Sequence, residues 1–174
     1  MYAGHFATAL ALKAARPSVP TWTVLLGSGL LDVAFGALVI AGVEGGAPDY
    51  AQSHRLLIPW SHSLLGAVVL AGLYALALRK RAPGAGPVLF AAVLSHWLLD
   101  LAVHPADMQL WPGDARAYGF VRLFGPVSGW FETALVLAAL GYYAWRARHS
   151  AAFGRHWAGA CTVVAALWML GLAA

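Results

Sequence analysis

Long runs of apolar residues alternate with short polar segments along the whole chain. Five of these runs reach the roughly 20 residues that a helix needs to cross a bilayer core about 30 Å thick. They lie between the charged residues, and we place them at 21–43, 60–79, 86–104, 125–146 and 156–173. The pattern therefore predicts an all-α, polytopic transmembrane helical bundle with five long spans.

The first twelve residues are apolar but short. As a helix they would extend about 18 Å, at 1.5 Å per residue. The segment 16–20 (Arg-Pro-Ser-Val-Pro) then breaks any helix, because proline has no amide hydrogen and restricts the residue before it. We expect a short N-terminal helix that either packs into the bundle or lies at the membrane interface.

Composition supports a membrane location. Of the 174 residues, 61% are hydrophobic and 10% are charged, whereas soluble domains carry about 25% charged residues. A soluble enzyme and a disordered chain are therefore excluded, and the length suits one integral membrane domain over 1–174. The net charge of +4 is better explained by basic loops than by nucleic-acid binding, for which the chain offers no basic stripe.

Charged residues divide unevenly between the loops. The loops at 13–20, 79–85 and 146–155 hold eight basic and no acidic residues, whereas those at 44–59 and 105–124 hold three basic and four acidic residues. Basic loops stay on the cytoplasmic side of a membrane. We therefore predict a multi-pass protein of the bacterial inner membrane whose two long loops face the periplasm.

Seven ionisable residues lie within or beside the outer halves of the predicted spans. A carboxylate at the centre of a span costs roughly 2.5–3.5 kcal/mol. No lysine or arginine lies inside a predicted span, so the available partners are protons, hydroxyls, histidines or a metal ion. The seven are Asp32, Asp100, Glu132, His5, His62, His96 and His104.

His96, Asp100 and His104 follow one another at intervals of four residues. This spacing places all three on one helix face. Two ligands four residues apart can hold one metal ion, and a ladder of hydrogen bonds along the helix is the alternative. The spacing alone leaves both interpretations open.

The expected depth of the other ionisable residues in the membrane favours a metal site over a ladder of hydrogen bonds. His62 stands at the outer start of its span, and Asp32 lies midway along the first long span. Glu132 lies about two turns inside its own span, and His5 joins the same layer if the N-terminus faces outward. Four imidazoles and three carboxylates with no cation among them are typical of a divalent metal site, most simply zinc.

Several short motifs resemble the bacterial inner-membrane metal-dependent hydrolase family, the YdjM-like proteins. The resemblance covers most of residues 1–112, and it implies that His5, Asp32, His62, His96 and Asp100 are metal ligands or their supporting residues. The matching pieces are Gly4-His5, Leu30-Leu31-Asp32, Ser61-His62-Ser63, Ser95-His96-Trp97-Leu98-Leu99-Asp100 and Val103-His104-Pro105-Ala106-Asp107.

Together these observations favour a membrane-embedded, zinc-type hydrolase with an outward-facing site. A bound metal would activate water, with Asp32 or Glu132 as general base and His104 as a further catalytic group. A site at headgroup depth favours a lipid or lipid-linked ester or phosphoester as substrate. The alternatives are a small transporter or proton relay, and a structural subunit of a membrane complex.

Overall fold

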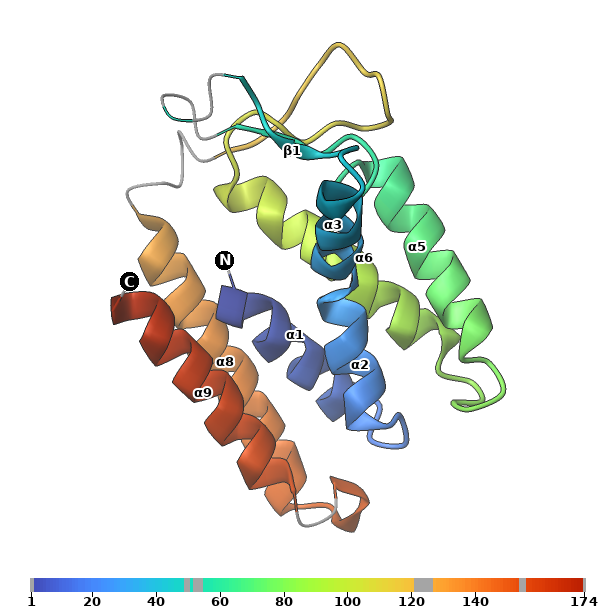
Figure 1. Ribbon diagram of the computed structural model, residues 1–174. Helices are drawn as coiled ribbons and strands as arrows, with labels where there is room; N and C mark the ends of the chain where they lie inside the picture. Colours follow the sequence, from blue (N-terminus) through green and yellow to red (C-terminus); the bar gives the residue numbers. More distant parts are fainter. Residues whose placement is uncertain (1, 49–50, 52–54, 121–126, 154–155, 174) are drawn as a thin grey trace.

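The structure is a computed structural model that describes residues 2–48, 51, 55–120, 127–153 and 156–173. Within these residues it is mainly helical (Figure 1). Two short strands, β1 (Gly45–Gly46) and β2 (Leu56–Leu57), pair antiparallel. The α-helices are α1 (Tyr2–Ala15), α2 (Thr21–Ser28), α3 (Leu30–Ile40), α5 (Leu64–Ala77), α6 (Gly86–Val103), α8 (Ser128–Arg148) and α9 (Trp157–Ala173).

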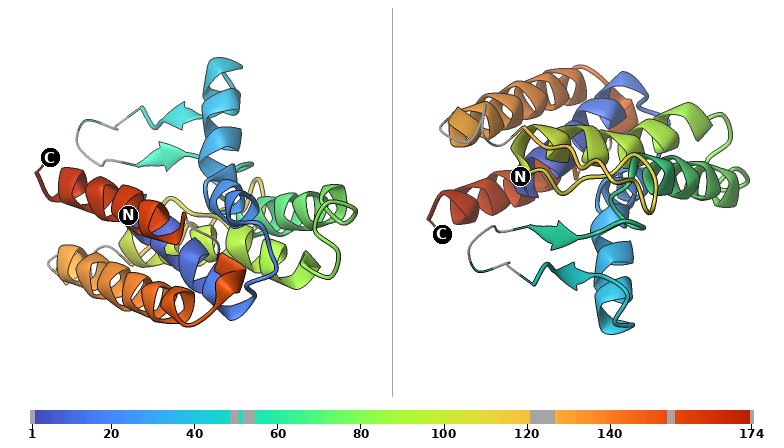
Figure 2. Two further views of the ribbon diagram at one scale, coloured as in Figure 1. Left: turned by 90° about the horizontal axis from the view of Figure 1, so that it is seen from below. Right: turned by 90° about the horizontal axis from the view of Figure 1, so that it is seen from above.

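Helix α1 occupies the middle of the bundle. It packs against α8 and α9 on one side and against α2 and α6 on the other, while α5 packs against α6. Figure 2 shows that α3 projects away from the other helices, with the β1–β2 hairpin beside it. The expected N-terminal helix is thus part of the bundle and does not lie at its surface.

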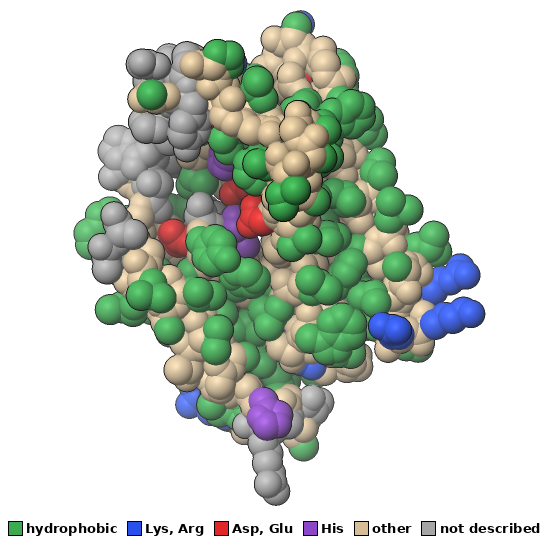
Figure 3. Space-filling model, in the orientation of Figure 1, with side chains coloured by type: hydrophobic (Ala, Val, Ile, Leu, Met, Phe, Trp, Pro, Cys, Tyr) green, Lys and Arg blue, Asp and Glu red, His purple; other side chains and the backbone are tan. Residues whose placement is uncertain are grey.

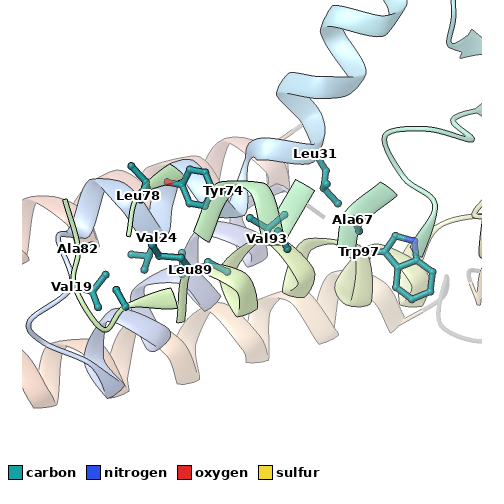
Figure 4. Packing of buried hydrophobic residues seen from close by; sticks show 14 of the residues in the cluster. Val19, Val24, Leu31, Ala67, Tyr74, Leu78, Ala82, Leu89, Val93 and Trp97 are labelled. Carbon is teal, nitrogen blue, oxygen red and sulfur yellow. The ribbon is translucent and has the colours of Figure 1, made fainter. Parts of the chain in front are cut away.

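Two apolar clusters hold the helices together. The first joins α2, α5 and α6 and includes Val24, Leu89 and Val93, each fully buried (Figure 4). The second joins α1, α8 and α9 through residues such as Leu10 and Tyr143. Burial of a large apolar side chain stabilises a fold by roughly 1.5–3 kcal/mol relative to exposure in water. Because α1 lies between the two clusters, it links the halves of the bundle.

The expectation of five long spans is wrong. Among the described residues, α6 alone is long and apolar enough to cross a membrane, and the bent pair α2–α3 passes the same test only if it is counted as one span. Helices α5 and α9 are apolar but shorter than this limit. Helix α8 is long, but it contains Glu132 near its start and Arg146 and Arg148 in its last turn.

The distance between charged residues overestimates helix length because it counts loops and breaks as helix. The region 21–43 divides at Gly29, where the two helices differ in direction by 47°. The region 60–79 becomes helical only at Leu64, after an extended Ser63 that caps α5. The first two residues of the predicted span 125–146 lie outside the described part of the chain.

The two ends of the bundle differ in their loops. The connections from α1 to α2, from α5 to α6 and from α8 to α9 lie at one end, and the hairpin and the segment after α6 lie at the other (Figure 1). The first of these ends carries the basic residues identified in the sequence, including Arg16, Lys80 and Arg148.

Candidate metal centre

Helix α6 supplies two buried members of a polar cluster near the end of the bundle that carries the hairpin. His96 and Asp100 lie one turn apart on the same face, and neither is more than 3% exposed. His96 Nε2 is 3.0 Å from Asp100 Oδ2. His104 is the C-cap residue of α6, and its Nε2 lies 3.8 Å from the same carboxylate oxygen. The i, i+4, i+8 series thus converges on Asp100.

His5 reaches this cluster from α1. Its Nε2 lies 3.0 Å from Asp100 Oδ1, and its ring stacks on that of His96 with centroids 3.8 Å apart and planes at 3°. Ala9, one turn after His5 on the same helix, is fully buried in the apolar cluster that contains α6. Such a small side chain allows helices to approach closely, which brings His5 within reach of α6.

Asp32 reaches the cluster because the chain bends at Gly29. The bend starts a new helix, α3, and Asp32 lies in its first turn, where a carboxylate interacts favourably with the helix dipole. Asp32 Oδ1 lies 3.5 Å from His96 Nε2 and 3.7 Å from His62 Nε2. Its side chain is 46% exposed, so Asp32 is the member of the cluster that solvent or substrate reaches most easily.

His62 is fixed by the way the chain enters α5. Ser63 Oγ accepts a hydrogen bond from the Gly66 amide at 3.1 Å. A Cβ at position 66 would lie 1.9 Å from the Trp60 carbonyl oxygen, so only glycine permits this close approach. Trp97 Nε1 donates a hydrogen bond to the His62 carbonyl at 2.8 Å. The segment before α5 is therefore held by contacts with both α5 and α6, and His62 faces the cluster.

All four imidazoles turn Nε2 toward the two carboxylates. In three of them Nδ1 contacts an oxygen outside the cluster: Ser61 Oγ at 2.8 Å from His62, the Ser28 carbonyl at 2.5 Å from His96, and Asp107 Oδ1 at 3.1 Å from His104. His96 Nε2 is buried and has no hydrogen bond of acceptable geometry to a described residue. Its polar neighbours among the described residues are the carboxylates of Asp100 and Asp32.

The six side chains surround a cavity of about 140 Å³. Ten of the described residues line this cavity, and none of these ten is a lysine or an arginine. Figure 3 shows acidic and histidine side chains in a hollow on this face, whereas the lysine and arginine side chains in view lie outside it, toward the edges of the molecule. The cavity walls are Tyr2, His5, Asp32, Phe35, Leu56, Ile58, His62, His96, Asp100 and His104.

The donor set suits a divalent metal ion. Two overlapping groups of three residues each have ligand atoms within 4.8 Å of one another, namely His5, His96 and Asp100, and Asp32, His62 and His96. Two donors bound tetrahedrally to one zinc ion lie roughly 3.3–3.6 Å apart, close to the separations of 3.0–3.8 Å found here. Imidazole and carboxylate ligands are those that zinc takes at catalytic sites.

Two histidines that lie outside helix α6 and the bent pair α2–α3 differ in their electrostatic surroundings. Burial lowers the pKa of His5 below its ordinary value, against the opposing effect of Asp100. Burial also acts to lower the pKa of His104, but its contacts with Asp107 and Asp100 raise the pKa overall. His5 therefore favours the neutral imidazole, the form that binds a metal.

Glu132 does not join this cluster. Its Oε1 accepts a hydrogen bond at 3.0 Å from the backbone amide of Gly4, near the start of α1, and it is not among the residues that line the cavity. A carboxylate at this point satisfies an amide that the helix leaves free. The structure thus gives Glu132 a contact that stabilises α1 next to His5, outside the cluster of histidines and carboxylates.

Two further buried carboxylates, Asp107 and Glu44, were not among the candidate site residues predicted from the sequence. Asp107 contacts His104 and also accepts a hydrogen bond from the Leu56 amide at 2.9 Å. Glu44 accepts hydrogen bonds from the backbone and the hydroxyl of Ser61. For Asp107 the spacing of three residues from His104 was an available signal, whereas nothing in the sequence connects Glu44 with Ser61.

Comparison with known families gives one match across almost the entire chain. The profile of the family described as YdjM inner membrane protein matches residues 2–173. No curated protein and no solved structure gave a match. The chain therefore belongs to the YdjM family and is an inner membrane protein.

Proposed function

We propose that this member of the YdjM family is a metal-dependent hydrolase of the inner membrane. The observation that carries the proposal is the convergence of four imidazole Nε2 atoms and two carboxylates on one cavity, with no lysine or arginine among the described residues of its walls. Buried and half-buried carboxylates are costly unless they are paired, and a divalent ion would offset that cost.

His5, His96 and Asp100 are the first choice as metal ligands, since all three are buried and mutually close. His62 and Asp32 complete the set from the facing side of the cavity. When bound, a zinc ion supplies a Lewis acid that activates water and polarises the bond to be cleaved. The proposal takes zinc as the ion because imidazole and carboxylate donors suit it.

Two side chains at the cavity are suited to move protons. Asp32 is the general base, since it is the exposed carboxylate of the cluster and accepts a proton from water at its free oxygen. His104 presents Nε2 to the cavity while Asp107 holds its Nδ1. His104 therefore passes a proton to the leaving group. Glu132 has neither position, so we assign it no step.

An apolar groove supports a lipid as substrate. It lies between α3 and α5, measures about 480 Å³, and its walls include Leu38, Trp60, Leu65 and Val69. Ser61, the neighbour of His62, also contributes to these walls. A groove of this kind next to the polar cavity suits an acyl chain whose ester or phosphoester bond reaches the cluster.

The proposed orientation has the cavity on the periplasmic side. The loops rich in lysine and arginine lie at the opposite end of the bundle. Basic segments of inner membrane proteins stay on the cytoplasmic side. A cavity that opens at the other end would meet lipids of the outer leaflet.

One observation supports a proton relay as a second candidate. A continuous series of contacts between imidazoles and carboxylates runs from His5 through Asp100 and His104 to Asp107. Buried Asp and His series serve proton transfer in membrane proteins. A relay works without a metal ion and without ester hydrolysis, so the experiment below separates the two candidates.

The test compares His96→Ala with His149→Ala. The protein is purified in detergent, treated with a chelator, and assayed on carboxylic-ester and phosphoester lipids with and without added zinc. We expect zinc to restore hydrolysis in the wild type and in His149→Ala, because His149 is an exposed residue that contacts the Trp145 carbonyl. His96→Ala should stay inactive. Zinc-independent hydrolysis, or none on any lipid of the panel, would refute the proposal.

A further inference from the structure

Glu44, Ser61 and His62 form a buried series of hydrogen bonds behind the proposed centre. Ser61 Oγ lies 2.5 Å from Glu44 Oε2 and 2.8 Å from His62 Nδ1. The three residues are between 1% and 7% exposed. Glu44 comes just before strand β1, and Ser61 and His62 come after strand β2, so the contact also joins the two sides of the hairpin.

Glu44 accepts hydrogen bonds with both of its carboxylate oxygens. Its Oε1 accepts hydrogen bonds from the backbone amides of Trp60 at 2.7 Å and Ser61 at 2.9 Å, and its Oε2 accepts the hydroxyl of Ser61. A carboxylate can only accept, so the Ser61 hydroxyl hydrogen must point to Glu44. The Ser61 oxygen is then left with lone pairs alone.

The direction of these bonds fixes the tautomer of His62. Because Ser61 Oγ has no hydrogen left to give, it accepts one from His62 Nδ1. In a neutral imidazole the other nitrogen, Nε2, is then free of hydrogen. That nitrogen faces Asp32 and Asp100 at 3.7 and 3.6 Å. The series thus turns a bare lone pair toward the cavity.

We propose that Glu44 is a positioning residue of the metal centre, which acts through Ser61 to hold His62 in its metal-binding tautomer. The inference rests on the proposed metal centre and adds a residue that neither the motifs nor the cavity walls identify. A carboxylate also faces the Nδ1 of His104, in this case directly, since Asp107 contacts that nitrogen with one oxygen and the Leu56 amide with the other. Partners of this kind typically change metal affinity by 10–100-fold.

Glu44→Gln is the sharpest variant because it keeps the shape of the side chain. The amide oxygen of Gln must remain with the two backbone amides, so its NH₂ group faces Ser61 and donates to it. Ser61 then donates to His62 Nδ1, and the hydrogen of His62 moves to Nε2, where it blocks the metal. We expect zinc affinity to fall by 10–100-fold. Ser61→Ala, which removes the intermediate hydroxyl, should weaken zinc binding to a lesser extent.

Thr23→Val is the matched control. Thr23 is as buried as Ser61, but its hydroxyl donates to the Pro20 carbonyl at the start of α2, and Thr23 is not among the described residues that line the cavity. Loss of this hydrogen bond should lower the melting temperature and leave zinc affinity unchanged. Glu44→Gln should show the reverse pattern, a large loss of affinity with a small change in the melting temperature of the metal-free protein.

The test combines zinc titration with ¹⁵N NMR of histidine-labelled, metal-free protein. We expect His62 to be protonated at Nδ1 in the wild type and at Nε2 in Glu44→Gln. Unchanged zinc affinity in both Glu44→Gln and Ser61→Ala, or an unchanged His62 tautomer in Glu44→Gln, would overturn the inference. If the wild type binds no zinc, the proposed function fails, while the NMR result still decides whether Glu44 controls the tautomer.

Discussion

Helix α1 carries a buried polar side chain near each of its ends, His5 at the start and Lys13 in the last turn. Lys13 Nζ donates hydrogen bonds to the carbonyls of Pro17 and Val19, and it lies 5.4 Å from the centre of the Phe153 ring. His5 contacts Asp100 through Nε2, but its buried Nδ1 has no hydrogen bond to a described residue.

The contacts of Lys13 and His5 distinguish a structural end of α1 from an end that faces the candidate site. Lys13 is 5% exposed and His5 is 3% exposed, so burial does not distinguish them. Lys13 closes the turn after α1 with partners from its own neighbourhood, as a structural residue does. His5 contacts a carboxylate and an imidazole of another helix, α6, and its Nδ1 has no hydrogen bond to a described residue. We infer that the start of α1 serves the function and its end serves the fold.

The largest effect should follow from Asp100→Asn, which removes the charge that His5 faces. Asn keeps the size of the side chain but cannot replace the anionic ligand. We expect zinc affinity to fall by more than the roughly 100-fold typical of supporting residues, with the helices intact by circular dichroism. Equilibrium dialysis with zinc measures the loss. Wild-type affinity in this variant would remove Asp100 from the centre.

Asp32→Asn should act on turnover and spare the fold. Asp32 is the exposed carboxylate beside His62 and His96, and Asn cannot accept the proton that a general base takes. We expect turnover to fall by roughly 10²-fold, within the usual range for loss of a general base, with an unchanged melting temperature. Steady-state kinetics on the lipid that the substrate panel identifies would measure it. Full activity in this variant would contradict the assigned role.

Lys13→Met should produce the opposite pattern at the other end of α1. Met fills similar space but leaves the Pro17 and Val19 carbonyls without their donor. Hydrogen bonds from charged groups contribute about 1.5–3 kcal/mol, so we expect a loss of about 2 kcal/mol in the free energy of unfolding. Zinc affinity should not change. A loss of zinc in this variant, at a temperature where it is folded, would mean that the two ends are not separate.

Glu132→Gln should have the smallest effect. Its contact with the Gly4 amide is one hydrogen bond at the start of α1. Gln retains an acceptor for that amide. We expect a loss of no more than about 1 kcal/mol in stability and no change in turnover. A drop in turnover comparable to that of Asp32→Asn would restore Glu132 as a candidate base.

The grouping of the candidate site residues could be predicted from the sequence more completely than the fold could. The interval of four residues on one helix face was enough to group His96, Asp100 and His104, since helix geometry fixes their direction. Depth in the membrane and the motifs added His5, Asp32 and His62, and the structure places all six around one cavity. That they bind a metal stays a prediction.

Depth alone could not place Glu132, because it gives no direction around the helix axis. The five spans failed for a related reason: apolar length does not reveal a break such as the one at Gly29. Glu44 was beyond reach because its contact with Ser61 spans 17 positions and depends on how the hairpin folds. Local spacing therefore grouped the helical members of the cluster, whereas their supporting contacts depend on the tertiary fold.

Zinc content per chain tests the central claim most directly. Wild type, Asp100→Asn and Lys13→Met would be purified side by side in detergent, supplied with zinc, freed of excess ion and measured by elemental analysis against protein concentration. The account predicts at least one tightly held zinc ion per chain in the wild type and in Lys13→Met, and a strong loss in Asp100→Asn. A wild type without bound zinc, or equal zinc in all three proteins, would contradict it.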